Sequence, residues 1–352
     1  MLNVNFWLKK LIKEWIFASS LLGLIILSIY LKRFPHYDIG DFNVLFNLFL
    51  LFVVLKSVEN AGLFEFARNL ISGKFIKTKL VVLSAVLSLF VTNDVALLCT
   101  VPITIISNVE YKSIVVILQA IAVNALSSLL PTGNPQNMYI YLFYNLNLPE
   151  FIKSIYPLSI TSFFISVLIA VVLDIFKTDS SQKQRNPVNK NLLISVVDLI
   201  FAILVVLKIL PIYFGFLLLA YYAIYNRKAF LIDYILLATF FVFFGLTDNL
   251  KQVINIHLTY NNAVFITSTL LSQFMSNVPA ALFLSDFTNK WQQLLWGVSV
   301  GGFGSLIGSL ANLIAYRLYV VHVDSSAKFL IKFLILNYIF FTLGCGLYFI
   351  VH

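Results

Sequence analysis

The sequence predicts an all-α polytopic membrane protein, built as an inverted-topology repeat of two halves. Three observations lead to this fold class. The 352 residues are 60% hydrophobic and only 11% charged, with a mean hydropathy of +0.93, whereas a soluble globule of this size carries more charge on its surface. Apolar stretches of membrane-spanning length recur along the chain. Polar residues interrupt several of these stretches, in the same order in each half.

About nine apolar stretches are long enough to cross a bilayer, since a crossing needs about 20 helical residues, or fewer when the flanks reach the interface. They cover residues 15–31, 42–57, 113–147, 151–176, 192–208, 211–226, 230–246, 291–320 and 328–351. The first stretch is followed by Lys32 and Arg33 rather than by a small-residue cleavage site. We therefore expect a retained first span and not a cleaved signal peptide.

Two further segments, 79–109 and 261–288, each consist of two apolar runs joined by a polar tip. Each run has about 13 residues, which is too short to cross a bilayer as a helix, so each segment is predicted to be a re-entrant hairpin. The tips contain Thr92, Asn93 and Asp94 in the first hairpin, and Ser276 and Asn277 in the second.

Two of the predicted spans are themselves interrupted, near 131–137 and near 308–312. The interrupting residues are Thr132, Gly133, Asn134 and Asn137 in the first half, and Gly308, Ser309 and Asn312 in the second. A shift of 175 positions places Gly133 on Gly308 and Asn137 on Asn312. Hydrocarbon cannot hydrogen-bond an unwound backbone, so such breaks persist only inside protein or beside a wet cavity. Paired broken segments in two halves of one chain indicate a transporter's binding site.

The distribution of charge predicts the orientation. With the N-terminus in the cytoplasm, most of the 24 lysine and arginine residues, Arg317 among them, fall on the cytoplasmic side, as the positive-inside rule requires. The polar segment 177–191 then forms a cytoplasmic linker. It joins a first half, 1–176, whose hairpin enters from the cytoplasm, to a second half, 192–352, whose hairpin enters from outside. Segment 58–78 has the spacing of an interfacial helix.

The net charge of +9 is spread over short loops and no nucleic-acid module is present, so nucleic acid is not an expected partner. The expected partners are a small anionic substrate and the lipid bilayer. No cofactor is expected, apart from sodium or a proton as coupling ion. Asp233 lies near a span end, and no arginine lies in a tip to signal a carboxylate clamp.

The tips and breaks hold residues suited to small ions. Where one half-helix ends and another begins, free carbonyls suit a cation and free N–H groups suit an anion. Asn93 and Asn277 carry both a carbonyl and an amide donor, so they can serve a cation, an anion or both. Gly133 and Gly308 permit backbone turns that other residues resist. Asp94 is an ionisable group at the depth of the membrane. Such a group is energetically costly there, so we hypothesise that Asp94 has a functional role.

The alternative interpretation is that these residues are ordinary helix caps. Asp94 would then cap a helix that starts at Val95, and Pro279 would occupy a first helical turn. Four breaks in a repeated order favour the functional interpretation.

Three strings of residues resemble the ion transporter superfamily over roughly residues 40–350. They run from Thr92 to Leu98, from Thr132 to Asn137 and from Ser272 to Ala281. This superfamily includes divalent-anion/sodium symporters, citrate transporters, arsenite permeases and a group of sodium/proton antiporters. Dicarboxylate symporters have Ser-Asn-Thr at both tips and a Pro-Pro-Asn after each break. The Asn93-Asp94 tip and Pro135-Gln136-Asn137 look closer to the arsenite-permease and antiporter branch.

The resemblance implies two inverted repeats with opposed hairpins, elevator-type alternating access and often a homodimer. It also implies sodium at Asn93, Gly133, Asn277 and Gly308. The full predicted binding set comprises Thr92, Asn93, Asp94, Thr132, Gly133, Asn134, Asn137, Ser276, Asn277, Gly308, Ser309 and Asn312.

The predicted protein is a multi-pass secondary active transporter of the plasma membrane. It moves a small anion, either an organic carboxylate or an inorganic oxyanion, with sodium or protons. The alternatives are a sodium/proton antiporter or an arsenite-type efflux permease and, more remotely, a channel or a membrane enzyme. The sequence has no His-Glu-x-x-His metal motif and no phosphate-binding loop, which argues against an enzyme or an ATP-driven pump.

Overall fold

The computed structural model describes residues 15–177, 191–253, 258–323 and 326–352. All regular elements in these residues are helical. The α-helices are α2 (Trp15–Leu31), α3 (Ile39–Asn60), α4 (Leu63–Leu70), α5 (Ile76–Ser88), α6 (Asn93–Ile106), α7 (Lys112–Ser127), α8 (Pro135–Phe143), α9 (Leu148–Phe176), α10 (Asn191–Val206), α11 (Tyr213–Tyr225), α12 (Tyr234–Val253), α13 (Asn261–Met275), α14 (Asn277–Ser285), α15 (Trp291–Gly301), α16 (Leu310–Val323) and α17 (Ser326–Val351). Two short 3-10 helices, η1 (Pro131–Gly133) and η2 (Arg227–Phe230), complete the set. The predicted linker 177–191 lies almost entirely outside the described residues.

Four of the described helices are long and apolar enough to cross a membrane. They are Ile39–Asn60, Leu148–Phe176, Tyr234–Val253 and Ala327–Val351. Large apolar side chains such as Ile29, Leu217 and Ile350 are exposed on the outer surface, as expected where lipid replaces water as the solvent. The chain is therefore an all-helical, multi-pass membrane protein.

Three of the predicted crossings correspond to shorter helices. The stretches 15–31, 192–208 and 211–226 form α2, α10 and α11, which have 17, 16 and 13 residues. These lengths fall below the roughly 20 residues of a full crossing. The count of about nine crossings therefore remains a prediction.

Charged side chains make hydrogen bonds at several helix ends. Asp38 accepts a hydrogen bond from Asp41 N at 2.9 Å and Asp41 accepts one from Asp38 N at 3.0 Å, which forms a capping box at the start of α3. Asp174, in the last turn of α9, accepts hydrogen bonds from Thr78 N and Oγ1 at the start of α5, at 2.9 and 2.8 Å. The buried Lys77 Nζ donates to the Lys177 carbonyl at 2.6 Å. These bonds fasten the first arm of the first hairpin to the end of α9.

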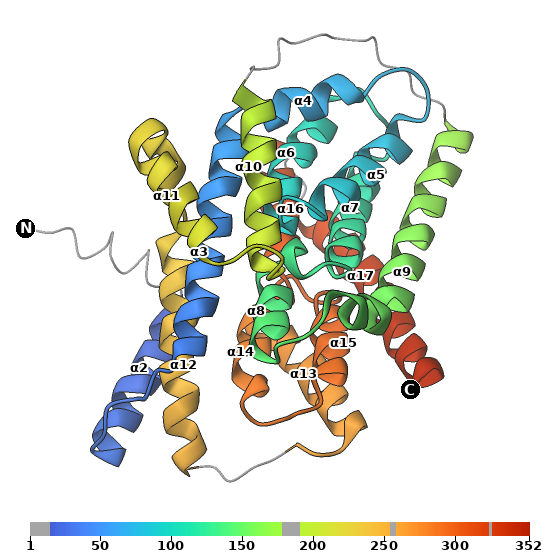
Figure 1. The fold of residues 1–352 in the computed structure, drawn as a ribbon. Helices are drawn as coiled ribbons and strands as arrows, with labels where there is room; N and C mark the ends of the chain where they lie inside the picture. Colours follow the sequence, from blue (N-terminus) through green and yellow to red (C-terminus); the bar gives the residue numbers. More distant parts are fainter. Residues whose placement is uncertain (1–14, 178–190, 254–257, 324–325) are drawn as a thin grey trace, which may run out of the picture.

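The two hairpins approach from opposite ends of the molecule. Helices α5 and α6 form the hairpin predicted at 79–109, and α13 and α14 form the one predicted at 261–288. Figure 1 shows the first pair in the upper half and the second pair in the lower half. The first arm of each hairpin packs along a helix of its own half, α5 on α7 and α13 on α15. The second arm packs on the other half, α6 on α16 and α14 on α8. The hairpins and broken helices thus form one interlocked core.

Both broken spans are present, and each break lies somewhat earlier than predicted. Helix α7 ends at Ser127 and α8 begins at Pro135, so the first break covers 128–134 and overlaps the predicted 131–137. The second break covers 302–309 and overlaps the predicted 308–312, and Leu310 to Asn312 form the first turn of α16 as Pro135 to Asn137 form that of α8. The glycines at its start explain why the second break begins early. Gly304 has a φ of +94°, which a right-handed helix cannot contain.

The interfacial helix predicted at 58–78 is shorter than expected. Helix α3 continues to Asn60, and α4 covers only Leu63–Leu70. Leu63 and Ala67 of α4 are buried, while Glu65 and Arg68 lie on its other face. This amphipathic pattern is typical of a helix that lies along a surface.

Candidate functional site

Each hairpin tip turns at a residue with an unusual backbone conformation. Thr92 has φ 26° and ψ 153°, and Ser276 has φ 75° and ψ 156°. The next residue along, Asn93 or Asn277, begins the second arm of its hairpin. Side chains with a Cβ rarely adopt positive φ, and such conformations cost about 1–3 kcal/mol each. The surrounding structure therefore imposes the same turn at both tips.

Asp94 does not act as the cap that the alternative interpretation required. Helix α6 begins at Asn93, two residues before Val95, and the Asp94 N–H donates to Asn93 Oδ1 at 3.0 Å. Asp94 Oδ1 is buried and has no hydrogen-bond partner among the described residues. Its carboxyl group is therefore available to a ligand at the cavity that Asp94 lines.

The two breaks are closed by matching hydrogen bonds. In each break an asparagine amide donates to two backbone carbonyls at matching positions. The bonds run from Asn137 Nδ2 to Ser127 O (3.4 Å) and Leu130 O (3.2 Å), and from Asn312 Nδ2 to Gly302 O (2.9 Å) and Ser305 O (3.0 Å). These donors and acceptors are related by the shift of 175 positions seen in the sequence, from 137 to 312. Asn137 Nδ2 makes one further bond, to Ser128 O at 2.8 Å, which has no counterpart at Asn312.

The glycine of each break lies against the backbone. The N–H of Gly133 donates to Leu130 O, and that of Gly308 to Ser305 O, both at 3.2 Å. A Cβ at Gly133 would overlap the carbonyl oxygen of Ser127, and a Cβ at Gly308 would lie 2.6 Å from the carbonyl oxygen of Gly301. Close backbone packing, rather than a need for positive φ, therefore requires glycine at both positions.

Asn124 of α7 joins the two halves. Its Oδ1 accepts from Asn93 Nδ2 at 3.3 Å and from Ser309 Oγ at 3.0 Å, and its Nδ2 donates to Asn312 Oδ1 at 2.8 Å. The second tip is tied in separately, because Asn277 N donates to Gly308 O at 3.0 Å. The first tip is therefore linked to the second break through Asn124, and the second tip is bonded to it directly.

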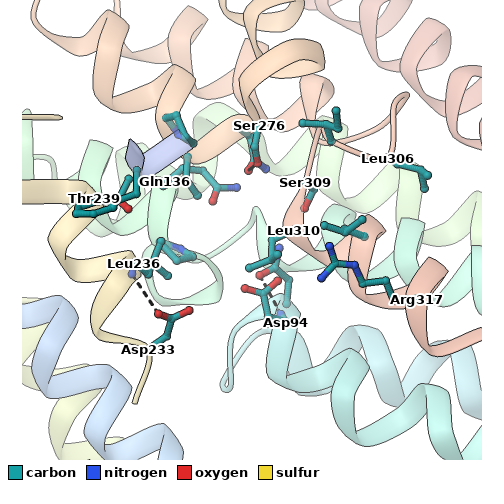
Figure 2. Close-up of a pocket in the computed structure, with 18 residues that line it drawn as sticks. Asp94, Gln136, Asp233, Leu236, Thr239, Ser276, Leu306, Ser309, Leu310 and Arg317 are labelled. Atoms are coloured by element: carbon teal, nitrogen blue, oxygen red, sulfur yellow. Dashed lines mark hydrogen bonds between the residues drawn. The ribbon is translucent and has the colours of Figure 1, made fainter. Parts of the chain in front are cut away.

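A cavity of about 350 Å³ lies in front of this network (Figure 2). Four helices, α6, α8, α14 and α16, begin at its wall. Their lining residues are Asn93 and Asp94 of α6, Pro135 and Gln136 of α8, Asn277, Val278 and Pro279 of α14, and Leu310, Leu313 and Arg317 of α16. A helix N-terminus carries partial positive charge and unpaired N–H groups. Four such ends around one cavity favour an anion.

Three charged residues line the cavity: Asp94, Asp233 and Arg317. Asp233 already has partners, since its Oδ1 accepts from Ile235 N at 3.0 Å and from Leu236 N at 3.2 Å at the start of α12. Figure 2 shows the Arg317 side chain extending from α16 into the cavity. The cavity can therefore offer one guanidinium group and one unpartnered carboxyl oxygen to a ligand.

The structure gathers the predicted binding residues around this cavity in two shells. Five of them line it: Asn93, Asp94, Ser276, Asn277 and Ser309. The others lie behind it in the tips and breaks: Thr92, Thr132, Gly133, Asn134, Asn137, Gly308 and Asn312. Contact with a ligand is thus a prediction for the first group. In the second group, the hydrogen bonds of Gly133, Asn134, Asn137, Gly308 and Asn312 support the breaks.

Sequence reasoning did not assign four polar lining residues to the site: Gln136, Asp233, Thr239 and Arg317. Arg317 was counted as a cytoplasmic charge and Asp233 as a span-end residue. The signal for Arg317 was available, because Leu310, Leu313 and Arg317 follow at spacings that share one face of a helix. Finding it required knowing that α16 begins at Leu310.

Opposed hairpins, broken helices and a cavity at their tips define a multi-pass membrane transporter. The chain belongs to the citrate transporter family, whose model matches residues 16–301. It is 32% identical over 294 residues to the uncharacterized transporter MJ0456 of Methanocaldococcus jannaschii, covering 80% of this chain and 82% of that protein. It is 31% identical over 300 residues to the inner membrane protein YbiR of Escherichia coli, covering 79% and 80%. The resemblance to the ion transporter group is thereby confirmed.

Proposed function

We propose that this protein is a secondary active transporter of a small anion, either an organic carboxylate or an inorganic oxyanion, coupled to sodium or protons. The observation that carries the proposal is the meeting of four helix N-termini and Arg317 at one cavity. Partial positive charges and a guanidinium group stabilise an anion. An ion gradient is the proposed driving force, since the sequence has no phosphate-binding loop for ATP.

We further propose that the two halves are inverted repeats and operate by elevator-type alternating access. The matching hydrogen bonds of Asn137 and Asn312 support the repeat, as does the exchange of packing in which α6 lies on α16 and α14 on α8. This interlocked core holds every cavity residue of both tips, so it can carry the site as a unit. Alternating access in repeat-built transporters commonly moves one such unit against the rest.

The coupling ion has two candidate positions. Asp94, with its unpartnered oxygen, can take a proton or a cation. Sodium can use oxygens at the tips and breaks, at Asn93, Gly133, Asn277 and Gly308. Asn93 Oδ1 and Gly308 O each accept one hydrogen bond, which leaves a second lone pair on each oxygen for an ion.

A sodium/proton antiporter or an arsenite-type permease is the second candidate. The observation that favours it is the pair of carboxylates, Asp94 and Asp233, on the wall of the same cavity. Under this alternative the cation itself is the cargo and Asp94 exchanges it for a proton.

Transport by the purified protein in liposomes tests both candidates. The panel comprises monocarboxylates, dicarboxylates, citrate, sulfate, arsenite and sodium, with and without imposed sodium and proton gradients. Saturable accumulation of an anion that depends on one gradient supports the proposed function. Sodium–proton exchange with no anion movement supports the antiporter instead. Flux that does not saturate and shows no counterflow indicates a channel.

We place the protein in the cell membrane as a homodimer with a cytoplasmic N-terminus. Cysteine substitution tests the orientation, because Lys74 before the first hairpin and His352 at the end of α17 should lie on opposite sides. An impermeant thiol reagent added outside cells should modify His352→Cys and spare Lys74→Cys. The reverse pattern contradicts the orientation. Cross-linking in native membranes tests the dimer.

A further inference from the structure

We propose that Arg317 binds the carboxylate of a small monoanionic organic acid, whose apolar part lies on the aliphatic wall of the same cavity. This inference rests on the proposed function and narrows its substrate class. It also concerns a residue outside the family match, which ends at residue 301.

Arg317 is exposed to the cavity and has no partner. Among the described residues it makes no hydrogen bond and no ion pair. Several other cations are paired with carboxylates, such as Arg33 with Asp248, Lys77 with Asp174, and Lys251 with Asp286. Arg317 lies two turns into α16, and its guanidinium group points into the cavity (Figure 2). A charged group inside a membrane protein is costly unless it is paired or serves a ligand.

The chemistry of the guanidinium group identifies the part of the ligand that it binds. Its planar fork of N–H donors matches the two oxygens of a carboxylate and holds them by two parallel hydrogen bonds. The positive ends of α6 and α14 border the same space. A carboxylate is therefore stabilised from three directions.

The cavity wall beside Arg317 is aliphatic, while Gln136, Thr239, Ser276 and Asn277 supply polar groups elsewhere on it. Leu306, Ile307, Leu310 and Leu313 lie on the α16 side, next to Arg317. These side chains offer no hydrogen bonds to hydroxyl or further carboxylate groups. They favour an apolar substituent, which leaves water when it binds.

The charge balance of the cavity disfavours a polyanion. One guanidinium group faces two carboxyl side chains, Asp94 and Asp233. A second or third carboxylate of the ligand would find no further cation on the wall and would lie near these two groups. Like charges brought together in a poorly solvated site repel strongly. Citrate and other polycarboxylates should therefore bind worse than a monocarboxylate of similar size.

The test is uptake kinetics of the full-length protein in liposomes, with butyrate, pyruvate, succinate, citrate and sulfate as substrates. Wild-type protein should transport the monocarboxylates with the lowest KM. Arg317→Gln should raise that KM at least tenfold, the scale expected for losing a charge-assisted hydrogen-bonded pair. Arg317→Lys keeps the positive charge but loses the planar guanidinium group, so it should raise the KM less than Arg317→Gln does. The matched control is Arg227→Gln, because Arg227 is an exposed arginine whose Nε donates only to Ala223 O of α11 among the described residues.

A second variant tests the charge balance. Asp233→Asn keeps the cap of α12, since asparagine caps about as well as aspartate, and removes one negative charge. The ratio of succinate uptake to butyrate uptake should rise in this variant. An unchanged ratio contradicts the proposed repulsion of polyanions.

The outcomes separate this inference from the proposed function. Transport of an anion that is unaffected by Arg317→Gln overturns the inference and leaves the function standing. A wild-type preference for citrate does the same. If the wild type moves none of the anions, both are overturned. Thermal melting of each variant controls for folding, and Arg317→Gln should melt near the wild-type midpoint because Arg317 has no partner to lose.

Discussion

Asn124 and Asn312 are 188 positions apart in the chain, and the amide of one donates to the amide oxygen of the other at 2.8 Å. Asn124 belongs to the last turn of α7, and Asn312 to the first turn of α16. This hydrogen bond therefore crosses between the two halves where both broken helices come together. It makes the geometry of one break depend on that of the other.

Replacing Asn124 with alanine should destabilise the protein. The change leaves Asn312 Oδ1 and Asn93 Nδ2, both on buried residues, without the partner they have now. A buried polar group that loses its partner costs about 1–3 kcal/mol. Thermal or denaturant unfolding in detergent measures the loss. The control is Asn147→Ala, at an exposed asparagine whose side chain makes no cap bond. Equal stability of the two variants would show that the cross-half bond contributes nothing.

Alanine at either break glycine should abolish transport and lower the melting temperature. The added Cβ meets a backbone carbonyl, of Ser127 for Gly133→Ala and of Gly301 for Gly308→Ala, and overpacking of this kind costs about 1–3 kcal/mol. Gly346→Ala is the matched control, since nothing lies within 4 Å of a Cβ built there. Normal uptake by Gly133→Ala or Gly308→Ala would contradict the close packing.

The two tip asparagines should differ in their effects on stability while both being needed for transport. Asn93 bonds Asn124 and the Asp94 N–H, whereas the Asn277 side chain has only a 3.5 Å contact with Ser276 Oγ. Asn277→Ala should therefore melt close to the wild type, and Asn93→Ala below it. Each should lose uptake if its amide contacts an ion, because a hydrogen bond to a charge contributes about 1.5–3 kcal/mol. Near-normal uptake by both variants would leave the asparagines a structural role only.

Asp94→Asn should abolish the coupling of transport to an ion without impairing folding. The substitution keeps the size of the side chain and removes its charge, and Asp94 Oδ1 has no protein partner to lose. Stability should therefore stay near that of the wild type, while the dependence of transport on sodium or pH disappears. Uptake assays at several sodium concentrations and pH values measure this. A variant that still accumulates substrate with unchanged ion dependence would remove Asp94 from the coupling mechanism.

Hairpins and broken helices were predictable from sequence because each polar interruption divides an apolar run into pieces too short to span. Both hairpins and both breaks lie close to where the composition predicts them. The second break begins earlier than predicted because polar letters mark Ser309 and Asn312, whereas the unwinding begins at Gly302. Glycine does not register as polar, so the start of that break had no compositional signal. Arg317 was missed for the same reason, since its face of α16 is defined only once the helix start is known.

The positive φ of Thr92 and Ser276 has a consequence for the shape that the tips present to the cavity. Both residues are held by the fold in a conformation that a free chain rarely visits. The tips are therefore preorganised, and an arriving ligand does not have to order a loop before it makes its contacts. Glycine at either position would relieve the local strain and at the same time widen the range of shapes available to the tip. The unfavourable conformational energy of these turns lowers the stability of the fold once, when the chain folds. It does not add to the free energy of each transport cycle.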